Sequence, residues 1–157
     1  MEFLEPALRN RMNRFVEYIC RMPRTRGFGV QSPTAYAFLR RVVKEKGFLA
    51  NCSAVDVYPY GASQRERLLY RLRCAYPNVV VMPYAEWSAP MLADSVLGGR
   101  DSDTVLVLLD INQDRQSREE WRQLVADKRC FQVFDMLDIG VVFLDPSKPK
   151  QFFKVNY

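Results

Sequence analysis

Apolar residues recur every three or four positions over residues 3–22, which predicts an amphipathic helix. The arginines of this segment fall off the apolar stripe, and Pro23 is expected to help end the helix. The stripe consists of Leu4, Leu8, Met12, Phe15, Ile19 and Met22. Such a helix either packs on its own domain or forms the seam of a dimer, and the sequence leaves both possibilities open.

Two further helices are indicated by their start signals. Ser32 followed by Pro33 is typical of a cap and a first turn, and this helix is expected to stop at Gly47. The spacing of Ser63 and Glu66 is that of a capping box, which predicts the start of a third helix. The apolar face of that helix consists of Leu68, Leu69, Leu72 and Tyr76.

The second half of the chain alternates strands with helices. Val79–Met82 and Val105–Leu109 are continuous apolar runs, and the second is of the kind found in buried parallel strands. Between them, Ser88 is expected to cap a helix that ends at Gly98–Gly99. Another helix is expected over 118–128. The remaining strand-like segments are 54–58, 131–135, 141–144 and 152–156.

The end of the chain is expected to form an antiparallel hairpin, because turn residues at 145–149 separate the last two strand-like segments. Helices followed by strand–helix–strand–helix units are typical of the α/β class, here with a parallel centre and an antiparallel edge. We expect a single domain over 1–157. It has a helical N-terminal extension over 1–47 and the sheet core over 48–157.

Composition changes this picture mainly by what it excludes. The 157 residues include no histidine, so His-dependent catalytic triads and metal sites are excluded. No apolar run approaches the roughly 20 residues that span a bilayer, and charges interrupt residues 1–15, unlike a signal peptide. We therefore expect no membrane association. The four cysteines form no C-x-x-C pair, which predicts reduced thiols, buried small hydrophobes at Cys52, Cys74 and Cys130, and a cytoplasmic location.

Charge is divided unevenly along the chain. Residues 1–75 carry 14 Lys/Arg against 6 Asp/Glu, a net +8, and residues 76–157 carry 9 against 12, a net −3. A candidate nucleic-acid surface lies in the basic half, with Phe28 and Tyr36 as stacking groups. Its basic residues are those of RTRGFG (24–29) together with Arg40, Arg41, Lys44 and Lys46. Glutamates interrupt this set, so solvated helix faces are the favoured interpretation.

Three stretches of the chain resemble a bacterial group of class I SAM-dependent methyltransferase-like proteins, found in Bacteroides and its relatives. They are RTRGFGVQSPTAYAFLRRVV, LDINQDRQSREEWRQL and FQVFDMLDIGVVFLDPSKPKQFFKVNY. The segment RERLLYRLRCAYPNVVV is similar to the one that leads into the first sheet strand of that group. The resemblance implies a helical N-terminal segment, a Rossmann-like sheet and a closing antiparallel strand pair. None of these stretches is a catalytic signature.

The chain departs from this group at the cofactor site. In the group, the first strand leads to an acidic residue, a glycine-rich loop and a helix, and SAM lies over the loop. Here the acidic position is Met82 and the glycine positions are Tyr84 and Ser88. Pro90 also removes a free N–H near the start of the next helix. Positions where relatives tend to carry histidine hold Gln31, Asn112 and Phe152.

Several strand–helix units of the group are missing as well. The resemblance therefore implies a reduced Rossmann-like sheet with no catalytic, cofactor-binding or metal-binding residues. The positions that correspond to the lost site are Met82, Tyr84, Glu86, Trp87, Ser88, Asp110 and Asn112.

Two groups within these positions have competing interpretations. We favour Tyr84 and Trp87 as fillers of the vacated cavity over an aromatic clamp for a ligand. Asp110, Asn112 and Asp114 could coordinate a divalent cation. For Asp110 and Asn112, a role in satisfying backbone groups of the turn before helix 118–128 is favoured, because no other acidic motif completes a ligand set.

These observations lead to three hypotheses about function. The favoured one is a degenerate methyltransferase-like protein without SAM or another cofactor, which acts as a binding or scaffolding protein, either self-associated or paired with a protein partner. The first alternative is a SAM-dependent methyltransferase with an atypical or shared site, which requires an open pocket lined by Tyr84, Glu86, Trp87 and Asp110. The second alternative is a nucleic-acid-binding module that uses the basic N-terminal half.

Overall fold

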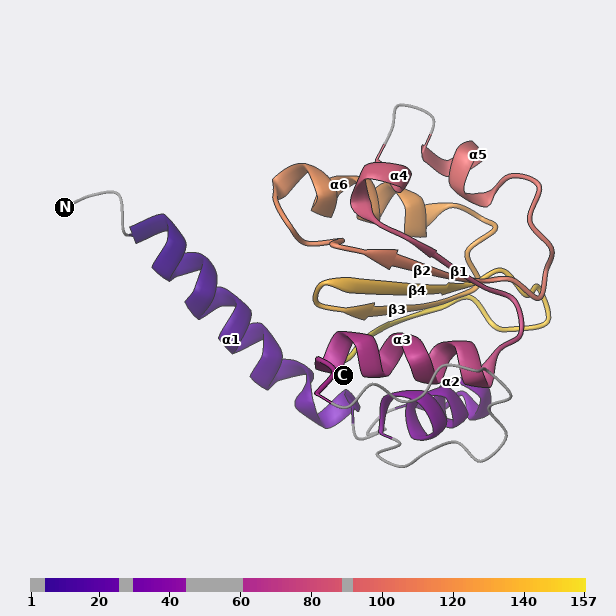
Figure 1. Cartoon of the computed structure of the whole chain (residues 1–157), viewed down its shortest axis with the longest axis horizontal. Helices are drawn as coiled ribbons and strands as arrows, with labels where there is room; N and C mark the ends of the chain where they lie inside the picture. The colour runs from indigo at the N-terminus through magenta and orange to yellow at the C-terminus, as the bar shows by residue number, and fades with distance from the viewer. Residues whose placement is uncertain (1–4, 26–29, 45–60, 89–91) are drawn as a thin grey trace.

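The chain is an α/β protein whose mixed five-stranded sheet has helices on both faces (Figure 1). The computed structural model describes residues 5–25, 30–44, 61–88 and 92–157. The α/β class predicted from the sequence is confirmed. The predicted helix stop at Gly47, the strand at 54–58 and the proline at position 90 lie outside the described residues.

The sheet has parallel pairs at its edges and antiparallel pairs at its centre. Its strands are β1 (Val79–Met82), β2 (Val105–Leu109), β3 (Gln132–Met136), β4 (Ile139–Phe143) and β5 (Gln151–Lys154). Their order is β1-β2-β4-β3-β5. β1 runs parallel to β2 and β5 runs parallel to β3, whereas β4 is antiparallel to both of its neighbours. The expectation of a parallel centre and an antiparallel edge is therefore wrong.

The antiparallel hairpin lies one strand earlier than predicted. It joins β3 to β4 through Leu137 and Asp138, and Leu137 adopts a left-handed backbone conformation with φ of 73°. The predicted turn at 145–149 does form, because the Lys148 N–H donates to the Asp145 carbonyl at 3.1 Å. It does not close a hairpin, since β2 and β3 already occupy both edges of β4. The last strand pairs instead with the free edge of β3.

One face of the sheet is covered by α2 (Pro33–Phe38), η1 (Leu39–Val43) and α3 (Gln64–Ala75). Ser32 caps α2 as predicted, because its hydroxyl accepts from the Ala35 N–H. The predicted capping box of α3 is also confirmed. The core on this face includes Phe38, Leu39, Val42, Leu68, Leu72, Val107, Phe134, Val141 and Phe143.

The other face is covered by α4 (Tyr84–Trp87), α5 (Leu92–Leu97) and α6 (Arg115–Ala126). α6 begins three residues before the predicted position 118, because Asp114 caps it and accepts from the Ser117 N–H at 2.7 Å. This bond is the main reason that the pKa of Asp114 is lowered. The core on this face includes Trp87, Leu97, Leu106, Leu108, Ile111, Trp121, Leu124 and Val142.

The N-terminal helix α1 (Glu5–Thr25) confirms the predicted amphipathic helix, but it continues past Pro23. Figure 1 shows that α1 projects away from the layered part of the chain, which is the sheet with the helices that cover it, and that the C-terminal end of α1 lies nearest to this part. None of the described helices combines the length and apolar character that crossing a bilayer requires.

Candidate functional site

The candidate site lies at the carboxyl ends of β1 and β2, where open α/β sheets place their ligands. These two strands are parallel neighbours, with Met82 paired to Leu108. The connection after β1 is not an extended loop. It folds at once into the single helical turn α4, in which the Glu86 N–H donates to the Pro83 carbonyl at 2.9 Å.

Trp87 fills the space between α4 and the sheet. Its side chain has no exposed surface, and its Nε1 donates to the Leu109 carbonyl oxygen at 2.8 Å. Because Leu109 is the last residue of β2, the indole lies across the end of that strand. Trp87 is therefore a core residue, as its interpretation as a filler expects.

Tyr84 holds α4 against α6. Its ring packs edge-on against Trp87 with a centroid distance of 4.9 Å, and its hydroxyl donates to Glu120 at 2.9 Å. Burial, followed by this hydrogen bond and the charge of Glu120, raises the pKa of Tyr84 to about 12. The phenol thus remains a neutral donor at physiological pH, which is the form that this contact requires.

The other positions around α4 do not converge on a shared pocket. Met82 is half-buried and its sulfur accepts from Arg100, while Glu86 is exposed. Ser88 ends α4 by donating its N–H to the Tyr84 carbonyl at 2.8 Å. The prediction that Ser88 caps the following helix depends on residues 89–91, which lie outside the described residues; the next helix, α5, is described over Leu92–Leu97. That helix does end before Gly98, as predicted.

Asp110 is turned toward the opposite layer of the fold. Its φ of 62° is in the left-handed region, and its carboxylate binds the Arg65 guanidinium of α3 at 2.9 Å. Trp87, with no exposed surface, lines no open pocket. Among the described residues, the pocket required by the atypical methyltransferase hypothesis is therefore not formed.

The three polar residues that were considered as cation ligands have separate roles. Asp110 pairs with Arg65, Asp114 caps α6, and Asn112 accepts a hydrogen bond from Arg14 of α1 through its carbonyl oxygen at 2.8 Å. The turn role favoured for the side chains of Asp110 and Asn112 is not found: the Asp110 carboxylate pairs with Arg65, and the buried Oδ1 of Asn112 has no hydrogen-bond partner among the described residues. Within the described part of the chain, no group of three His, Cys, Asp or Glu side chains is arranged to hold a metal ion.

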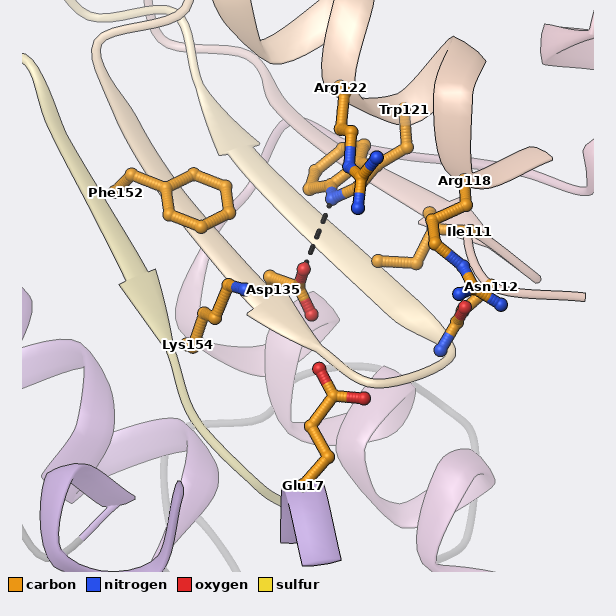
Figure 2. Close-up of a pocket in the computed structure, with 9 residues that line it drawn as sticks. All are labelled: Glu17, Ile111, Asn112, Arg118, Trp121, Arg122, Asp135, Phe152 and Lys154. Carbon is orange, nitrogen blue, oxygen red and sulfur yellow. Dashed lines mark hydrogen bonds between the residues drawn. The ribbon is translucent and has the colours of Figure 1, made fainter. Parts of the chain in front are cut away.

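A second candidate site, which the sequence does not indicate, is a cavity of about 310 Å³ between α1, α6, β3 and β5 (Figure 2). Asp135 of β3 lies at its centre and accepts hydrogen bonds from Arg21 at 2.7 Å and from the Trp121 indole at 3.4 Å. The other lining residues are Glu17, Ile111, Asn112, Arg118, Arg122, Phe152 and Lys154. The carboxylate at the centre is thus already bound by the protein.

The cavity is where α1 is attached to the rest of the chain. Arg21 has a side-chain exposure of only 4% and binds both Asp135 and Glu17. Nearby, the Asn156 amide donates to the Tyr18 carbonyl at 2.7 Å. The described contacts that attach α1 are therefore hydrogen bonds and ion pairs.

We expect Asp135→Asn to release the C-terminal half of α1. Asparagine keeps the shape of the side chain but leaves the Arg21 guanidinium without its buried anionic partner, which costs about 3 kcal/mol. Hydrogen exchange should show a corresponding loss of protection in α1. Glu119→Gln is the control, because Glu119 and Arg122 form an exposed pair at 3.6 Å, and such pairs contribute about 0–1 kcal/mol. Unchanged protection in the Asp135 variant would contradict the assigned role.

The cysteines have different environments. Cys130 is buried, and burial raises the pKa of its thiol to about 12, so it is the small hydrophobe that was predicted. Cys74 is disulfide-bonded, which corrects its interpretation as a reduced thiol. The cysteines therefore no longer favour a reducing compartment. Cys52 lies outside the described residues.

The basic surface considered for nucleic acid is described only in part. Arg40, Arg41, Lys44 and Tyr36 are exposed, while residues 26–29 and Lys46 lie outside the described part of the chain. Binding through this surface stays a prediction.

Comparison of the chain with known protein families, curated proteins and solved structures finds no match. The fold and its site therefore define the chain as an α/β protein with a mixed sheet, and the arguments about function come from its own residues.

Proposed function

We propose that the chain is a reduced, Rossmann-like relative of class I methyltransferases that no longer uses SAM and acts as a binding or scaffolding protein. The observation that carries the proposal is the position of Trp87. A nucleotide that binds an open α/β sheet approaches the backbone at the carboxyl ends of neighbouring parallel strands. In this chain the indole occupies that position and donates to the last carbonyl of β2.

The form of the connection after β1 supports the same proposal. Close approach of a phosphate or sulfonium ligand needs glycines and free N–H groups. Here the connection contains Tyr84, whose hydroxyl is bound to Glu120, and Pro83, which has no N–H. A ligand would have to displace the edge-on pair of Tyr84 and Trp87 before it reached the backbone.

Calorimetric titration of SAM and S-adenosylhomocysteine into the full chain tests this proposal. We expect no saturable heat with either compound at millimolar concentrations. A SAM-dependent methyltransferase of intact cofactor site, titrated under the same conditions, is the positive control. Micromolar binding of either compound would overturn the proposal in favour of an enzyme with an atypical site.

A further inference from the structure

The amphipathic helix α1 is attached to the protein by its polar face. Arg14 donates to the Asn112 carbonyl at 2.8 Å, and Arg21 binds Asp135 at 2.7 Å. Figure 2 shows Glu17 extending from α1 toward Asp135. These three positions follow a spacing of three and four, which places them along one face.

The apolar face of α1 is directed away from these contacts. With 3.6 residues per turn, Arg14 and Arg21 lie roughly 150° around the helix from the middle of the apolar stripe. The stripe residues whose side chains the structure describes, taken together with the adjacent Val16, have exposed fractions between 42% and 67%; they are Met12, Phe15, Val16, Ile19 and Met22. In the described part of the chain, six of the eight exposed large hydrophobic residues belong to α1.

This exposed face is large enough for an interface. A large side chain has a surface of about 200 Å², so the five stripe residues present on the order of 500 Å² of contiguous apolar surface. This area is comparable to the largest apolar patch on a typical monomer, which is about 300–600 Å² and is often functional. A standard interface buries about 800 Å² on each partner, part of it from a polar rim. The stripe therefore supplies most of the surface that one such interface needs.

We propose that this face is the seam of a homodimer in which α1 packs antiparallel against α1 of a second copy. The face is self-complementary about a two-fold axis between residues 15 and 16. This axis sets Phe15 against the smaller Val16 and Met12 against Ile19, which is of similar size. No charged residue lies within the stripe between residues 12 and 19, the span that this axis pairs with itself, so this part of the seam buries no unpaired charge.

The antiparallel direction follows from the shape of the chain. α1 leaves the layered part at its C-terminal end and runs away from it (Figure 1). A parallel pair would bring both layered parts to the same end of the seam. An antiparallel pair places them at opposite ends and aligns the two helix dipoles favourably.

The charge distribution favours a second copy over a lipid surface. Helices that lie in a membrane interface present Lys or Arg beside the apolar face, where these side chains reach the head groups. The cations of α1 whose side chains the structure describes, Arg14 and Arg21, are bound to the protein instead. One border of the stripe carries the uncharged, exposed residues Asn13 and Cys20.

Sedimentation velocity of the full chain from low to high micromolar concentration tests the dimer. The expected mass is twice 18.3 kDa, and Phe15→Glu should give the single mass with an unchanged circular-dichroism spectrum. Tyr36→Glu is the matched control, because Tyr36 is likewise an exposed aromatic residue but lies on α2. This variant should remain a dimer. A wild-type monomer at every concentration, or an assembly that survives Phe15→Glu, would overturn the proposal.

Mild oxidation tests the direction of the seam. Val16→Cys lies beside the proposed two-fold axis and should cross-link two copies, whereas the free, exposed Cys20 should not. In the antiparallel seam the two Cys20 residues are offset by about 13 Å along the axis, which exceeds the reach of a disulfide. Cross-linking through Cys20 would establish a parallel pair and overturn the proposed geometry.

A second copy of the chain is the partner of the binding protein proposed above. The role of the dimer rests on that proposed function, whereas the association of the two copies does not. Calorimetry with SAM and sedimentation give independent answers, so failure of one proposal is distinguishable from failure of the other. A monomer that co-sediments with vesicles of mixed neutral and anionic phospholipid, and loses this property in Phe15→Glu, would replace the dimer with a membrane-surface role.

Discussion

Trp87→Ala is expected to lower the free energy of unfolding by about 3–5 kcal/mol. The indole has no exposed surface, so its removal leaves a cavity between α4 and the sheet. It also leaves the Leu109 carbonyl without its donor and Tyr84 without its aromatic neighbour. Equilibrium unfolding in urea measures the loss.

Two further variants make this prediction specific. Glu86→Ala is the control on the same helical turn, and it should change the stability by less than about 0.5 kcal/mol because Glu86 is exposed. Trp87→Phe keeps a six-membered ring but removes the Nε1–H donor and the five-membered ring of the indole, so it should give an intermediate loss if alanine prevents folding. A loss below about 1 kcal/mol in the alanine variant would show that Trp87 is not a filler of the core.

Gly140→Ala is expected to destabilise the protein by about 3 kcal/mol. Gly140 lies on the central strand β4, directly beneath the ring of Trp121 from α6. A Cβ at this position would lie 2.4 Å from the nearest ring carbon, which is closer than side chains tolerate. The ring is also held by its hydrogen bond to Asp135, so it cannot move aside without losing that contact.

The clash predicts that the effects of substitutions at Gly140 and Trp121 are energetically coupled. A double-mutant cycle, with stabilities from urea unfolding, measures this coupling. Trp121→Leu removes the ring carbons that the new Cβ would meet, so the Gly140→Ala change should cost less in that background than in the wild type. Equal costs in the two backgrounds would exclude the clash as the cause.

Local signals along the sequence predicted much of the helical structure. The Ser32–Pro33 start and the Ser63–Glu66 capping box depend only on residues within three positions of each other, and both are found. The start of α6 was misplaced because Asp114 and Ser117 form a capping pair without the usual glutamate. Short-range hydrogen bonding thus predicts the element and not always its first residue.

Strand pairing could not be predicted in the same way. The turn at 145–149 has the stronger composition signal, with two prolines, whereas the actual hairpin turn contains Leu137 at a positive φ. A leucine is rarely found in this conformation, so the sequence carries no sign of it. The strand edge that is free to pair with β5 depends on how the other strands pair, which no local pattern reveals.

The candidate site was predicted in its parts but not in its arrangement. Trp87 was placed in the core because its loop lacks glycine, and the structure puts it there. Asp110 was identified as a polar residue at a strand end, but its partner Arg65 is 45 positions away on another layer. The Arg21–Asp135 pair spans 114 positions, and no local pattern connects two such residues.

The attachment of α1 also sets an order of events during synthesis. Tyr18 and its partner Asn156 are 138 positions apart, and Arg21 and Asp135 are 114 positions apart. At about 5–20 residues per second, the ribosome needs on the order of ten seconds to make the intervening chain. For that time the helix has none of these docking partners from its own chain. Neighbouring nascent chains on one messenger could therefore meet through α1 before either has completed its sheet.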